Sequence, residues 1–464
     1  MYSVQQPRAH LFYVHKIRIL SAFISITSFC YLLDGCAPKK EYRKWVSNPL
    51  LYNQTVKRLN DVVLENNFPP MIAARNYVYA CIAGYECIAA GNQQYQSLSG
   101  QIRHLPPMPS PSMIKGEIDF EFAALLAFTK VGNAVTFPEG SMMDYHAELI
   151  RMADSAGMSK LIQKASIAFS DTVAASILKW SKGDQYGATR GAEKFNVTNE
   201  MGRWIPTPPL YASAVEPHWK KIRTMVLDSA SQFSIPRPPA VEPANQKSVF
   251  YQAMLEVKRT GDSLTTEQKE IADFWDDNPF RMNVRGHVMF ATKKFSPPGH
   301  WLNIVGIAAQ SAGADFATTT AAYAHTAIAF FDAFIRSWEE KYRSVYLRPE
   351  TAIHQWMDEN WMPYIQTPPF PSYVSGHATN SAAAAEVMTH WFGDRLSVND
   401  TSLVEFGIKG RVLPSFRAAA AEAAMSRLYG GIHYRFDNEE GLKAGKQIGE
   451  LVVRKLIFKS TNKP

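Results

Sequence analysis

The chain has 464 residues, of which 46% are apolar and 20% are charged, so it can bury a large core and is not a disordered polymer. Lys and Arg number 49 against 42 Asp and Glu, and this net charge of +7 is too small over such a length to require a nucleic-acid partner, although it suits a site that holds an anion. Cysteine occurs only at Cys30, Cys36, Cys81 and Cys87, which excludes a disulfide framework and a zinc cluster.

The first 36 residues have the order of a secretory leader. Three basic residues between positions 8 and 18 precede an uncharged stretch at 19–33, which is shorter than the roughly 20 residues of a membrane span. The sequence Leu-Asp-Gly-Cys that ends at Cys36 resembles the cleavage box of bacterial lipoproteins, in which the cysteine is lipidated. We therefore expect residues 1–36 to be a signal peptide, of lipoprotein type if Cys36 is lipidated. The mature protein is expected to be exported, either periplasmic or lipid-anchored at the membrane surface.

Helical periodicity dominates the rest of the chain. We predict helices over residues 74–90, 117–131, 145–182, 266–275, 301–344, 378–392, 415–429 and 439–458. Cys81 and Cys87 lie on different faces of the first of these helices, so we expect them to pack in the core rather than form a disulfide. Strand-like alternation is almost absent, and proline-rich stretches separate the helices. The sequence predicts an all-α fold.

A lysine and an arginine lie seven residues apart near the end of the helix predicted at 301–344. These are Lys341 and Arg348, and a pair of this kind is more often part of a solvated face than of a site. Pro349 is expected to end the helix, which would place Arg348 at its exit.

The second candidate segment, residues 370–377, leads from a proline-rich loop into an alanine-rich helix. In one interpretation, Ser375 is an N-cap and Gly376 eases the turn, and neither has a further function. In the other, the unpaired N–H groups at the start of the helix form an anion seat, which Gly376 lets an anion approach. His377 would then stand beside the anion and exchange a proton with it near neutral pH.

The third candidate segment is residues 426–437, where one helix closes at Gly430-Gly431 and another is expected to begin near Asn438. His433 alone is compatible with a hydrogen-bonded core histidine, and Asp437 with an N-terminal charge of the next helix. Alternatively, the Asp437 carboxylate orients the His433 imidazole and leaves one ring nitrogen free to attack or to ligate.

Together the three segments supply permanent cations, neutral donors and two imidazoles. The cations are Lys341, Arg348 and Arg427, the donors are Ser375 and Gly376, and the imidazoles are His377 and His433. Arginine binds such oxygens in bidentate fashion and lysine acts as a point charge. The set suits a tetrahedral oxyanion that becomes trigonal bipyramidal, with His433 at one apical position and His377 facing the other.

The spacing of these residues resembles that of the vanadium-dependent haloperoxidases, in a superfamily that includes type 2 phosphatidic acid phosphatases and bacterial acid phosphatases. The pattern is Lys, six residues, Arg-Pro; then Ser-Gly-His; then Ser-Arg, five residues, His, three residues, Asp. The extended form Pro-Ser-Tyr-Val-Ser-Gly-His at 371–377 is familiar among haloperoxidases. Residues 69–75, 204–209, 274–279 and 297–301 also resemble segments of the bacterial members, so the likeness spans nearly the whole mature chain.

The resemblance implies two four-helix bundles, with residues 37–245 as the N-terminal half and residues 246–464 as the half that carries the oxyanion site. It also implies vanadate as the cofactor and hydrogen peroxide and halide as the substrates, giving a hypohalous acid equivalent. His433 would bind vanadium, and Lys341, Arg348, Arg427, Ser375 and the Gly376 amide would hold its oxygens. His377 would manage a proton, Lys341 would polarise the peroxide, and Asp437 would orient His433. Asp276 or Asp277 is expected to pair with Arg427.

The halide is suggested by Phe370, which stands where algal bromoperoxidases typically place an additional histidine. Trp338, one helical turn before Lys341, is expected in the same apolar wall. Iodide gives up electrons most easily, so we expect iodide first and bromide second, with an organic acceptor as a possible further partner.

One alternative is an exported acid phosphatase, because phosphate and vanadate are tetrahedral oxyanions of similar shape and phosphate can occupy the same seat. His433 would then form a phosphohistidine and His377 would protonate the leaving group. A further alternative is a non-catalytic exported anion-binding protein, although passive binding has no need for both histidines.

Overall fold

The computed structural model describes residues 38–136, 141–278, 282–285, 288–291 and 294–460. The predicted signal peptide, with Cys30 and Cys36, lies outside these residues. The described helices are α1 (Pro38–Val46), α2 (Pro49–Glu65), α3 (Pro70–Gly91), α4 (Phe120–Val135), α5 (Ser141–Ser155), α6 (Lys160–Ser181), α7 (Tyr186–Arg190), α8 (Val249–Asp262), α9 (Thr266–Phe274), α10 (Pro297–Ser311), α11 (Phe316–Ser344), α12 (Pro349–Trp356), α13 (Gly376–Phe392), α14 (Phe416–Tyr429) and α15 (Arg435–Lys455). None of these described helices is long and apolar enough to cross a membrane.

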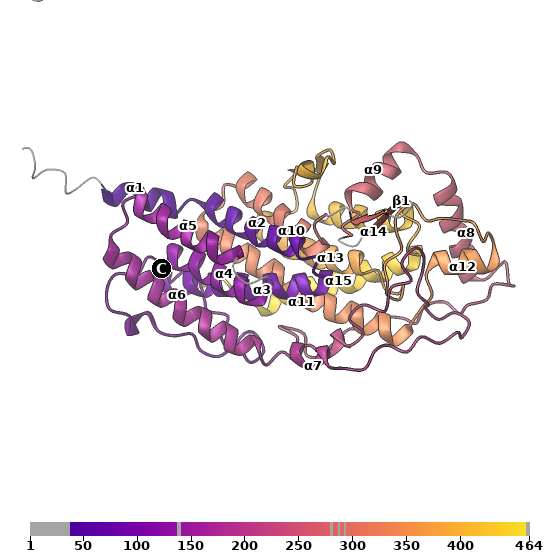
Figure 1. Ribbon diagram of the computed structural model, residues 1–464, viewed down its shortest axis with the longest axis horizontal. Helices are drawn as coiled ribbons and strands as arrows, with labels where there is room; N and C mark the ends of the chain where they lie inside the picture. Colours follow the sequence, from indigo (N-terminus) through magenta and orange to yellow (C-terminus); the bar gives the residue numbers. More distant parts are fainter. Residues whose placement is uncertain (1–37, 137–140, 279–281, 286–287, 292–293, 461–464) are drawn as a thin grey trace, which may run out of the picture.

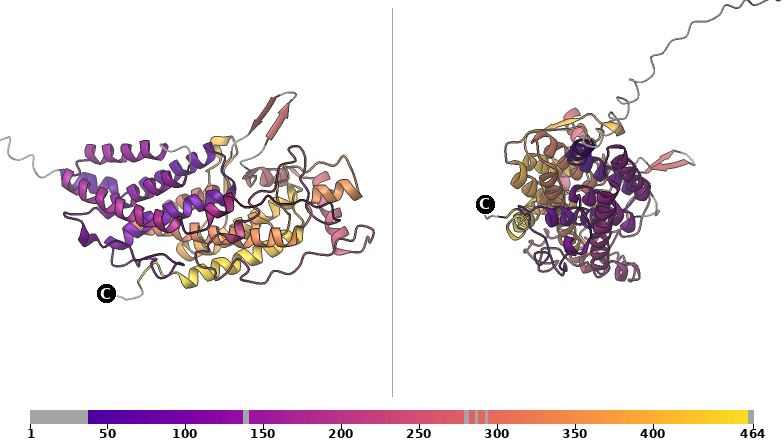
Figure 2. Two further views of the ribbon diagram at one scale, coloured as in Figure 1. Left: turned by 60° about the horizontal axis from the view of Figure 1, so that its bottom comes forward. Right: turned by 90° about the vertical axis from the view of Figure 1, so that its left-hand side faces the viewer.

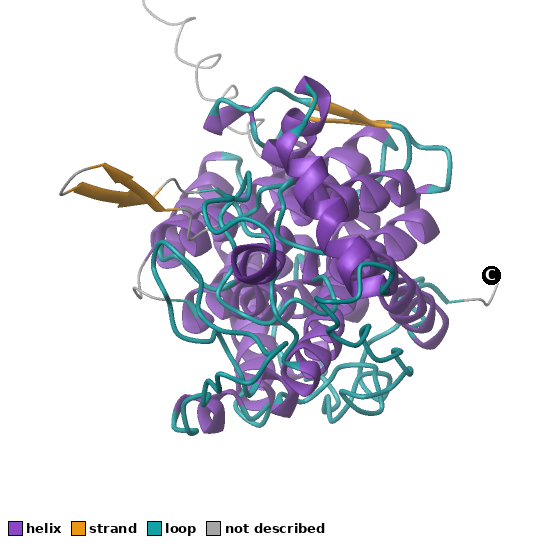
Figure 3. Ribbon diagram, turned by 90° about the vertical axis from the view of Figure 1, so that its right-hand side faces the viewer, coloured by secondary structure: helices purple, strands orange, loops and turns teal. Residues whose placement is uncertain are grey.

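The few strands form two small antiparallel hairpins. They are β1 (Met282–Arg285) with β2 (Val288–Ala291), and β3 (Val398–Asp400) with β4 (Arg411–Leu413). Figure 3 shows both hairpins at the edge of a helical body, and in Figure 2 the β1–β2 hairpin projects from it. The prediction of an all-α fold is confirmed.

The helices form an elongated body with α11 along its length (Figure 1). Helices α3, α4 and α6 pack against one another at one end, and α8, α9 and α12 lie at the other. The 29 residues of α11 span about 44 Å, so this helix contacts α3 as well as α13 and α15. The last turn of α11 places Lys341 toward the end of the molecule where α8, α9 and α12 lie.

Two predicted helices are each broken into two. The helix expected at 145–182 is α5 and α6, separated near Gly157 at φ +85°, and the helix expected at 301–344 is α10 and α11, separated near Gly313 at φ +63°. Glycine adopts this left-handed conformation without a Cβ clash. The Asp315 side chain then caps the next helix by accepting from the Thr318 N–H at 2.7 Å. Helices α1, α2, α7, α8 and α12 were not predicted.

Pro349 starts a helix rather than ending one, so this prediction was wrong. Helix α11 ends at Ser344, and Val345 follows in the left-handed region at φ 49°. Arg348 is the N-cap of α12 and Pro349 is its first residue, where the missing N–H of proline costs nothing. Arg348 is therefore held between two helices.

Cys81 and Cys87 are free and fully buried in α3, which confirms their expected place in the core. Burial raises the pKa of the Cys87 thiol well above its usual value, so this sulfur is an unreactive packing group.

Helices α13 and α15 pack unusually closely because glycines line one face of α15. A Cβ atom on Gly441, Gly445 or Gly449 would lie 2.9, 2.0 or 2.7 Å from a backbone carbonyl oxygen of α13. These oxygens belong to Ser375, Thr379 and Ala383, so both helices begin at the same end of the molecule. The contact fixes the start of α13 against the start of α15.

Replacing Gly445 with Ala is expected to lower the free energy of unfolding by about 1–3 kcal/mol, because the added methyl group overlaps the Thr379 carbonyl and no flexible side chain is there to yield. Urea unfolding would measure the loss. Gly187→Ala is the matched control, since its Cβ would meet nothing within 4 Å. Equal stability of the two variants would show that the helices separate without cost.

Candidate active site

Five helix ends meet at the site: the C-terminal ends of α11 and α14 and the N-terminal ends of α12, α13 and α15. The side chains predicted to hold the oxyanion come from these ends, including the Arg348 cap of α12. Lys341 and Arg348 are fully buried, so the interpretation of this pair as a solvated face was wrong. Arg427 and His433 are exposed by only 1% and 2%. The structure therefore brings the three predicted segments together inside the protein.

The Lys341 ammonium group lies beside two aromatic rings and donates hydrogen bonds to backbone oxygens. Its Nζ donates to the carbonyl oxygens of Pro371 at 2.9 Å and Ser372 at 2.8 Å. The Phe370 and Trp338 rings lie 4.9 Å apart, and Nζ is 5.1 and 5.8 Å from their centroids. Burial and the neighbouring Arg348 lower the pKa of Lys341 well below its usual value. An anion near Nζ would oppose this shift.

Arg348 holds the loop that precedes α13 and reaches the third segment. Its Nε donates to the Phe370 carbonyl at 2.8 Å, and its Nη1 donates to the Ile432 carbonyl at 2.9 Å. Nη1 also lies 3.1 Å from His433 Nε2. Nη2 is buried and has no hydrogen-bond partner. A buried guanidinium with one free corner is prepared to donate to a ligand.

His433 is oriented by Asp437, as predicted from their spacing. The ring Nδ1 lies 2.8 Å from Asp437 Oδ2, which also accepts from Ser372 Oγ at 2.5 Å. Since Arg348 Nη1 can only donate, His433 Nε2 must accept and Nδ1 must carry the hydrogen. Burial, then the charge of Arg348, lower the pKa of His433 well below its usual value. His433 is thus neutral with its lone pair on Nε2, the state in which an imidazole binds a metal.

Ser375 and Gly376 open α13 at the edge of the cation cluster. Ser375 Oγ accepts from the Ala378 N–H at 3.4 Å, so it is an N-cap, and the Ser375 N–H donates to the Asp437 carbonyl at 3.0 Å. A Cβ on Gly376 would lie 3.9 Å from Lys341 Cε. The capping interpretation is confirmed, and it is compatible with an anion seat because the positive end of the helix faces the same cluster.

His377 follows directly and lies among the same cations. Burial lowers its pKa well below the usual value, and the charges of Arg427, His300, Lys341 and Arg348 lower it further. Its Nε2 is buried without a hydrogen-bond partner, although the side chain as a whole is 19% exposed. His377 is therefore a neutral imidazole at the border between the cluster and solvent.

Arg427 reaches the cluster from the end of α14. Its Nε donates to Ser426 Oγ at 2.9 Å, and its Nη2 donates to the Trp275 carbonyl. Burial lowers the pKa of Arg427, and the carboxylates of Asp276 and Asp277 oppose this effect. The charges of both aspartates thus act on Arg427, and its direct pairing with one of them stays a prediction.

The sequence analysis assigned no role to Ser372, although its hydroxyl binds the Asp437 carboxylate. The signal was present, because Ser372 belongs to the same short segment as Ser375. His300 was also missed, and here only the local likeness at 297–301 pointed to the region. Its contacts with Asp277 and Asp400 join three segments far apart in the chain.

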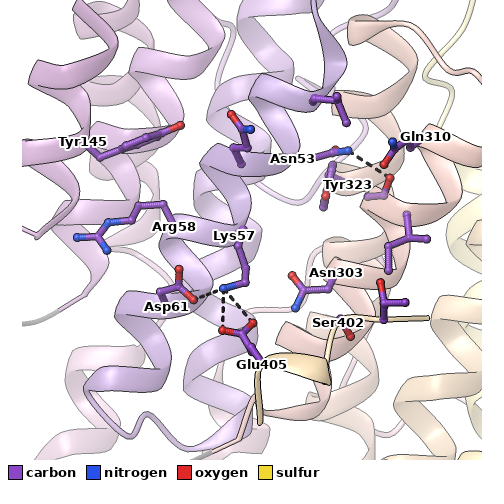
Figure 4. A pocket seen from close by; sticks show the side chains of 15 residues that line it. Asn53, Lys57, Arg58, Asp61, Tyr145, Asn303, Gln310, Tyr323, Ser402 and Glu405 are labelled. Atoms are coloured by element: carbon purple, nitrogen blue, oxygen red, sulfur yellow. Dashed lines mark hydrogen bonds and ion pairs between the residues drawn. The ribbon is translucent and has the colours of Figure 1, made fainter. Parts of the chain in front are cut away.

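A groove of the described chain lies elsewhere. It has a volume of about 620 Å³ between α2, α5, α10 and α11, and no residue predicted for the site lines it (Figure 4). Lys57 there already pairs with Asp61 at 2.5 Å and Glu405 at 3.1 Å. The chemistry of the cation cluster is separate from this groove.

The donor set fits a tetrahedral oxyanion. Within the described chain, Lys341 and Arg348 donate to carbonyl oxygens and His433 rather than to a carboxylate, so their charge is not neutralised by an ion pair. Arg348 Nη2 is also left without a hydrogen-bond partner. An oxyanion among these groups would satisfy both needs.

The chain is similar to known proteins over the residues of this site and beyond them. A family model described as the VCPO second helical-bundle domain matches residues 321–459, which contain all the residues predicted to hold the oxyanion. The crystal structure of a bacterial vanadium-dependent iodoperoxidase is 40% identical, covers 89% of this chain and 98% of its own, and has a TM-score of 0.84.

More distant structures show the same fold. The holo and apo forms of a bacterial vanadium-dependent chloroperoxidase are 17% and 18% identical, with TM-scores of 0.60 and 0.62. They cover 84% of this chain and 92% and 95% of their own lengths. No curated protein matches the sequence. The comparisons do not favour the acid phosphatase alternative, and the identity to the iodoperoxidase over most of both chains shows that this protein belongs to the vanadium-dependent haloperoxidases.

Proposed function

We propose that this haloperoxidase oxidises iodide in preference to bromide, with hydrogen peroxide as oxidant and vanadate as cofactor. The observation that carries the proposal is the cluster of three buried cations around a neutral His433. The similar iodoperoxidase supports iodide as the preferred halide.

In this proposal, the oxygens of vanadate would be held by Lys341, Arg348, Arg427, Ser375 and the Gly376 amide, and His433 Nε2 would bind vanadium. When bound, vanadate supplies a Lewis acid that activates peroxide without a redox change at the metal. The protein would hold the anion by charge and hydrogen bonds, Lys341 would polarise the peroxide, and the neutral His377 would accept or return a proton. Asp437 keeps the His433 lone pair on Nε2.

The preference for iodide rests on the apolar wall. The Phe370 ring lies 4.9 Å from the Arg348 guanidinium carbon and 5.1 Å from Lys341 Nζ, and Trp338 completes the wall behind it. No further titratable group stands at position 370 to strengthen the activation of a less reducing halide. Iodide is the most easily oxidised of the three halides, so it suits this wall best.

Replacing Phe370 with His is expected to raise the ratio of bromide to iodide kcat/KM by about tenfold, which corresponds to about 1.4 kcal/mol of transition-state energy. An imidazole at this position would add a hydrogen-bond donor beside Lys341. Phe370→Leu separates this effect from loss of the ring, and its ratio should stay near that of the wild type. An equal ratio in Phe370→His and wild type would show that another residue sets the preference.

The function is tested by loading the mature protein with orthovanadate and measuring peroxide-dependent oxidation of iodide, bromide and chloride. Hydrolysis of p-nitrophenyl phosphate is measured on protein without vanadate. We expect iodide to give the highest kcat/KM. Brisk phosphatase turnover without any halide oxidation would contradict the proposal, and a higher efficiency with chloride than with iodide would overturn the halide order.

We also propose that the protein is exported, because residues 1–36 have the order of a signal peptide. Mass analysis of the mature amino terminus in the native host would identify the first residue. A mature chain that begins at a lipidated Cys36 would support a membrane-surface anchor, and a chain that retains residues 1–36 would contradict export by this route.

A further inference from the structure

His300, near the start of α10, lies between two buried carboxylates. Its Nδ1 is 2.9 Å from Asp277 Oδ1 and its Nε2 is 2.8 Å from Asp400 Oδ2. The ring is fully buried, and the two carboxylates are exposed by 2% or less. Asp400 ends β3 and also accepts from the Ser402 N–H at 2.9 Å. The histidine therefore links the β3–β4 hairpin to the segment that follows α9.

The contacts favour an imidazolium at His300. An ionised carboxylate can only accept hydrogen bonds, so each ring nitrogen that faces one must donate. Burial alone would lower the pKa of His300, but the charges of Asp277 and Asp400 outweigh it and raise the pKa to about 10. Rings of Phe274 and Trp275, with centroids 5.3 and 5.0 Å away, fix the plane of the imidazole.

The other oxygen of Asp277 faces the active site. Asp277 Oδ2 lies 3.8 Å from His377 Nε2, and both atoms are buried without a hydrogen-bond partner. A movement of about 1 Å, or one bridging water, brings them into hydrogen-bond range. A possible donor, His377 Nε2, thus faces a possible acceptor, Asp277 Oδ2, and neither has another partner. The second oxygen of Asp277 is already held by His300.

We infer that His300 is a positioning residue for His377, acting through Asp277. By binding Oδ1, His300 holds the carboxylate with Oδ2 toward His377, so that His377 carries its hydrogen on Nε2 and offers its Nδ1 lone pair as the base. Asp400 keeps His300 in place from the other side. This inference rests on the proposed role of His377 as the residue that manages a proton.

The positive charge of His300 also acts directly on His377. The charge of His300 is one of those that lower the pKa of His377, so it helps to keep that ring neutral. A neutral side chain at position 300 would leave Asp277 and Asp400 close together without a cation between them. The contacts that hold Asp277 in place would be lost, and its carboxylate could turn away from His377.

A double-mutant cycle tests the inference. In the vanadate-loaded enzyme, His300→Gln should lower kcat for iodide oxidation by about 10- to 100-fold. In a His377→Gln background, the same change should lower kcat by less than about twofold, since the residue through which it acts is absent. Equal losses in the two backgrounds would overturn the inference. If His300→Gln does not fold, Asp400→Asn replaces it and should show the same dependence on His377.

A second measurement is independent of activity. In protein labelled with ¹⁵N-histidine and free of vanadate, His300 should have both ring nitrogens protonated at pH 7, and His377 should be neutral with hydrogen on Nε2. His300→Gln should give a mixture of His377 tautomers, with the resonances assigned by their absence in His377→Gln. An unchanged His377 tautomer, or a neutral His300, would overturn the inference.

The matched control is His325→Gln. His325 is also fully buried and accepts from Trp391 Nε1 at 3.1 Å, but it lies outside the cation cluster. It should lower thermal stability without changing the His377 tautomer. If the wild type loaded with vanadate oxidises no halide, the proposed function fails, while the tautomer of His377 still decides whether His300 positions it.

Discussion

Replacing His433 with Ala is expected to abolish vanadate-dependent halide oxidation, with a loss in kcat/KM of at least about a thousandfold. The change removes the Nε2 lone pair and leaves the buried Asp437 carboxylate without its imidazole partner. Vanadate binding should weaken as well, because only charge and hydrogen bonds would then hold the anion. Isothermal titration with orthovanadate and an iodide assay at saturating vanadate would measure both losses.

The control is His390→Ala, a histidine near the far end of α13 that is exposed to solvent. It should keep activity within about twofold of the wild type. Added imidazole should restore part of the activity of His433→Ala if the loss comes from the missing ring rather than from misfolding. Activity of His433→Ala within tenfold of the wild type would rule out His433 as the vanadium ligand.

Arg348→Lys is expected to lower kcat/KM by about 100- to 1000-fold although it keeps the charge. Arg348 binds the Phe370 and Ile432 carbonyls and His433 Nε2 while Nη2 remains free for the anion. The ammonium group of lysine is a point charge and cannot donate hydrogen bonds to all of these acceptors at once. Iodide kinetics and vanadate titration would show whether the loss appears in kcat, in binding, or in both.

Arg417→Lys is the matched control for this prediction. Arg417 is 46% exposed and pairs with Glu386 at 2.6 Å away from the site, so the substitution should have little effect on activity. If both lysine variants retained full activity, charge alone would be sufficient at position 348. The planar guanidinium group of Arg348 would then have no catalytic importance beyond its charge.

Much of the site could be predicted because its residues lie in short segments with fixed spacing. The His433 and Asp437 pair, the Ser375 cap and the apolar wall of Phe370 and Trp338 all follow from local patterns, and the structure places them as expected. The assignment of Lys341, Arg348, Ser375, Gly376, Arg427 and His433 as vanadate ligands stays a prediction, as does the division of the chain into halves at residue 245.

What could not be predicted depends on contacts between distant segments. The burial of Lys341 and the clamp of His300 by Asp277 and Asp400 join residues whose separation in the sequence gives no local signal. Helix boundaries were missed for a different reason: apolar periodicity continues across Gly157 and Gly313, although the backbone there turns. Tertiary packing decided the first two points, and local turns at glycine decided the helix boundaries.

The cations of the site have a consequence for how the enzyme is supplied with its cofactor. Lys341 and Arg348 are buried with only neutral acceptors, so any doubly charged tetrahedral anion of suitable size relieves their repulsion. Phosphate meets this description and is abundant in cells and in common buffers. The fraction of active enzyme in a preparation would therefore depend on the ratio of vanadate to phosphate to which the protein had been exposed, and not on the amount of folded protein. Dialysis against a phosphate-free buffer should set the starting point for every titration.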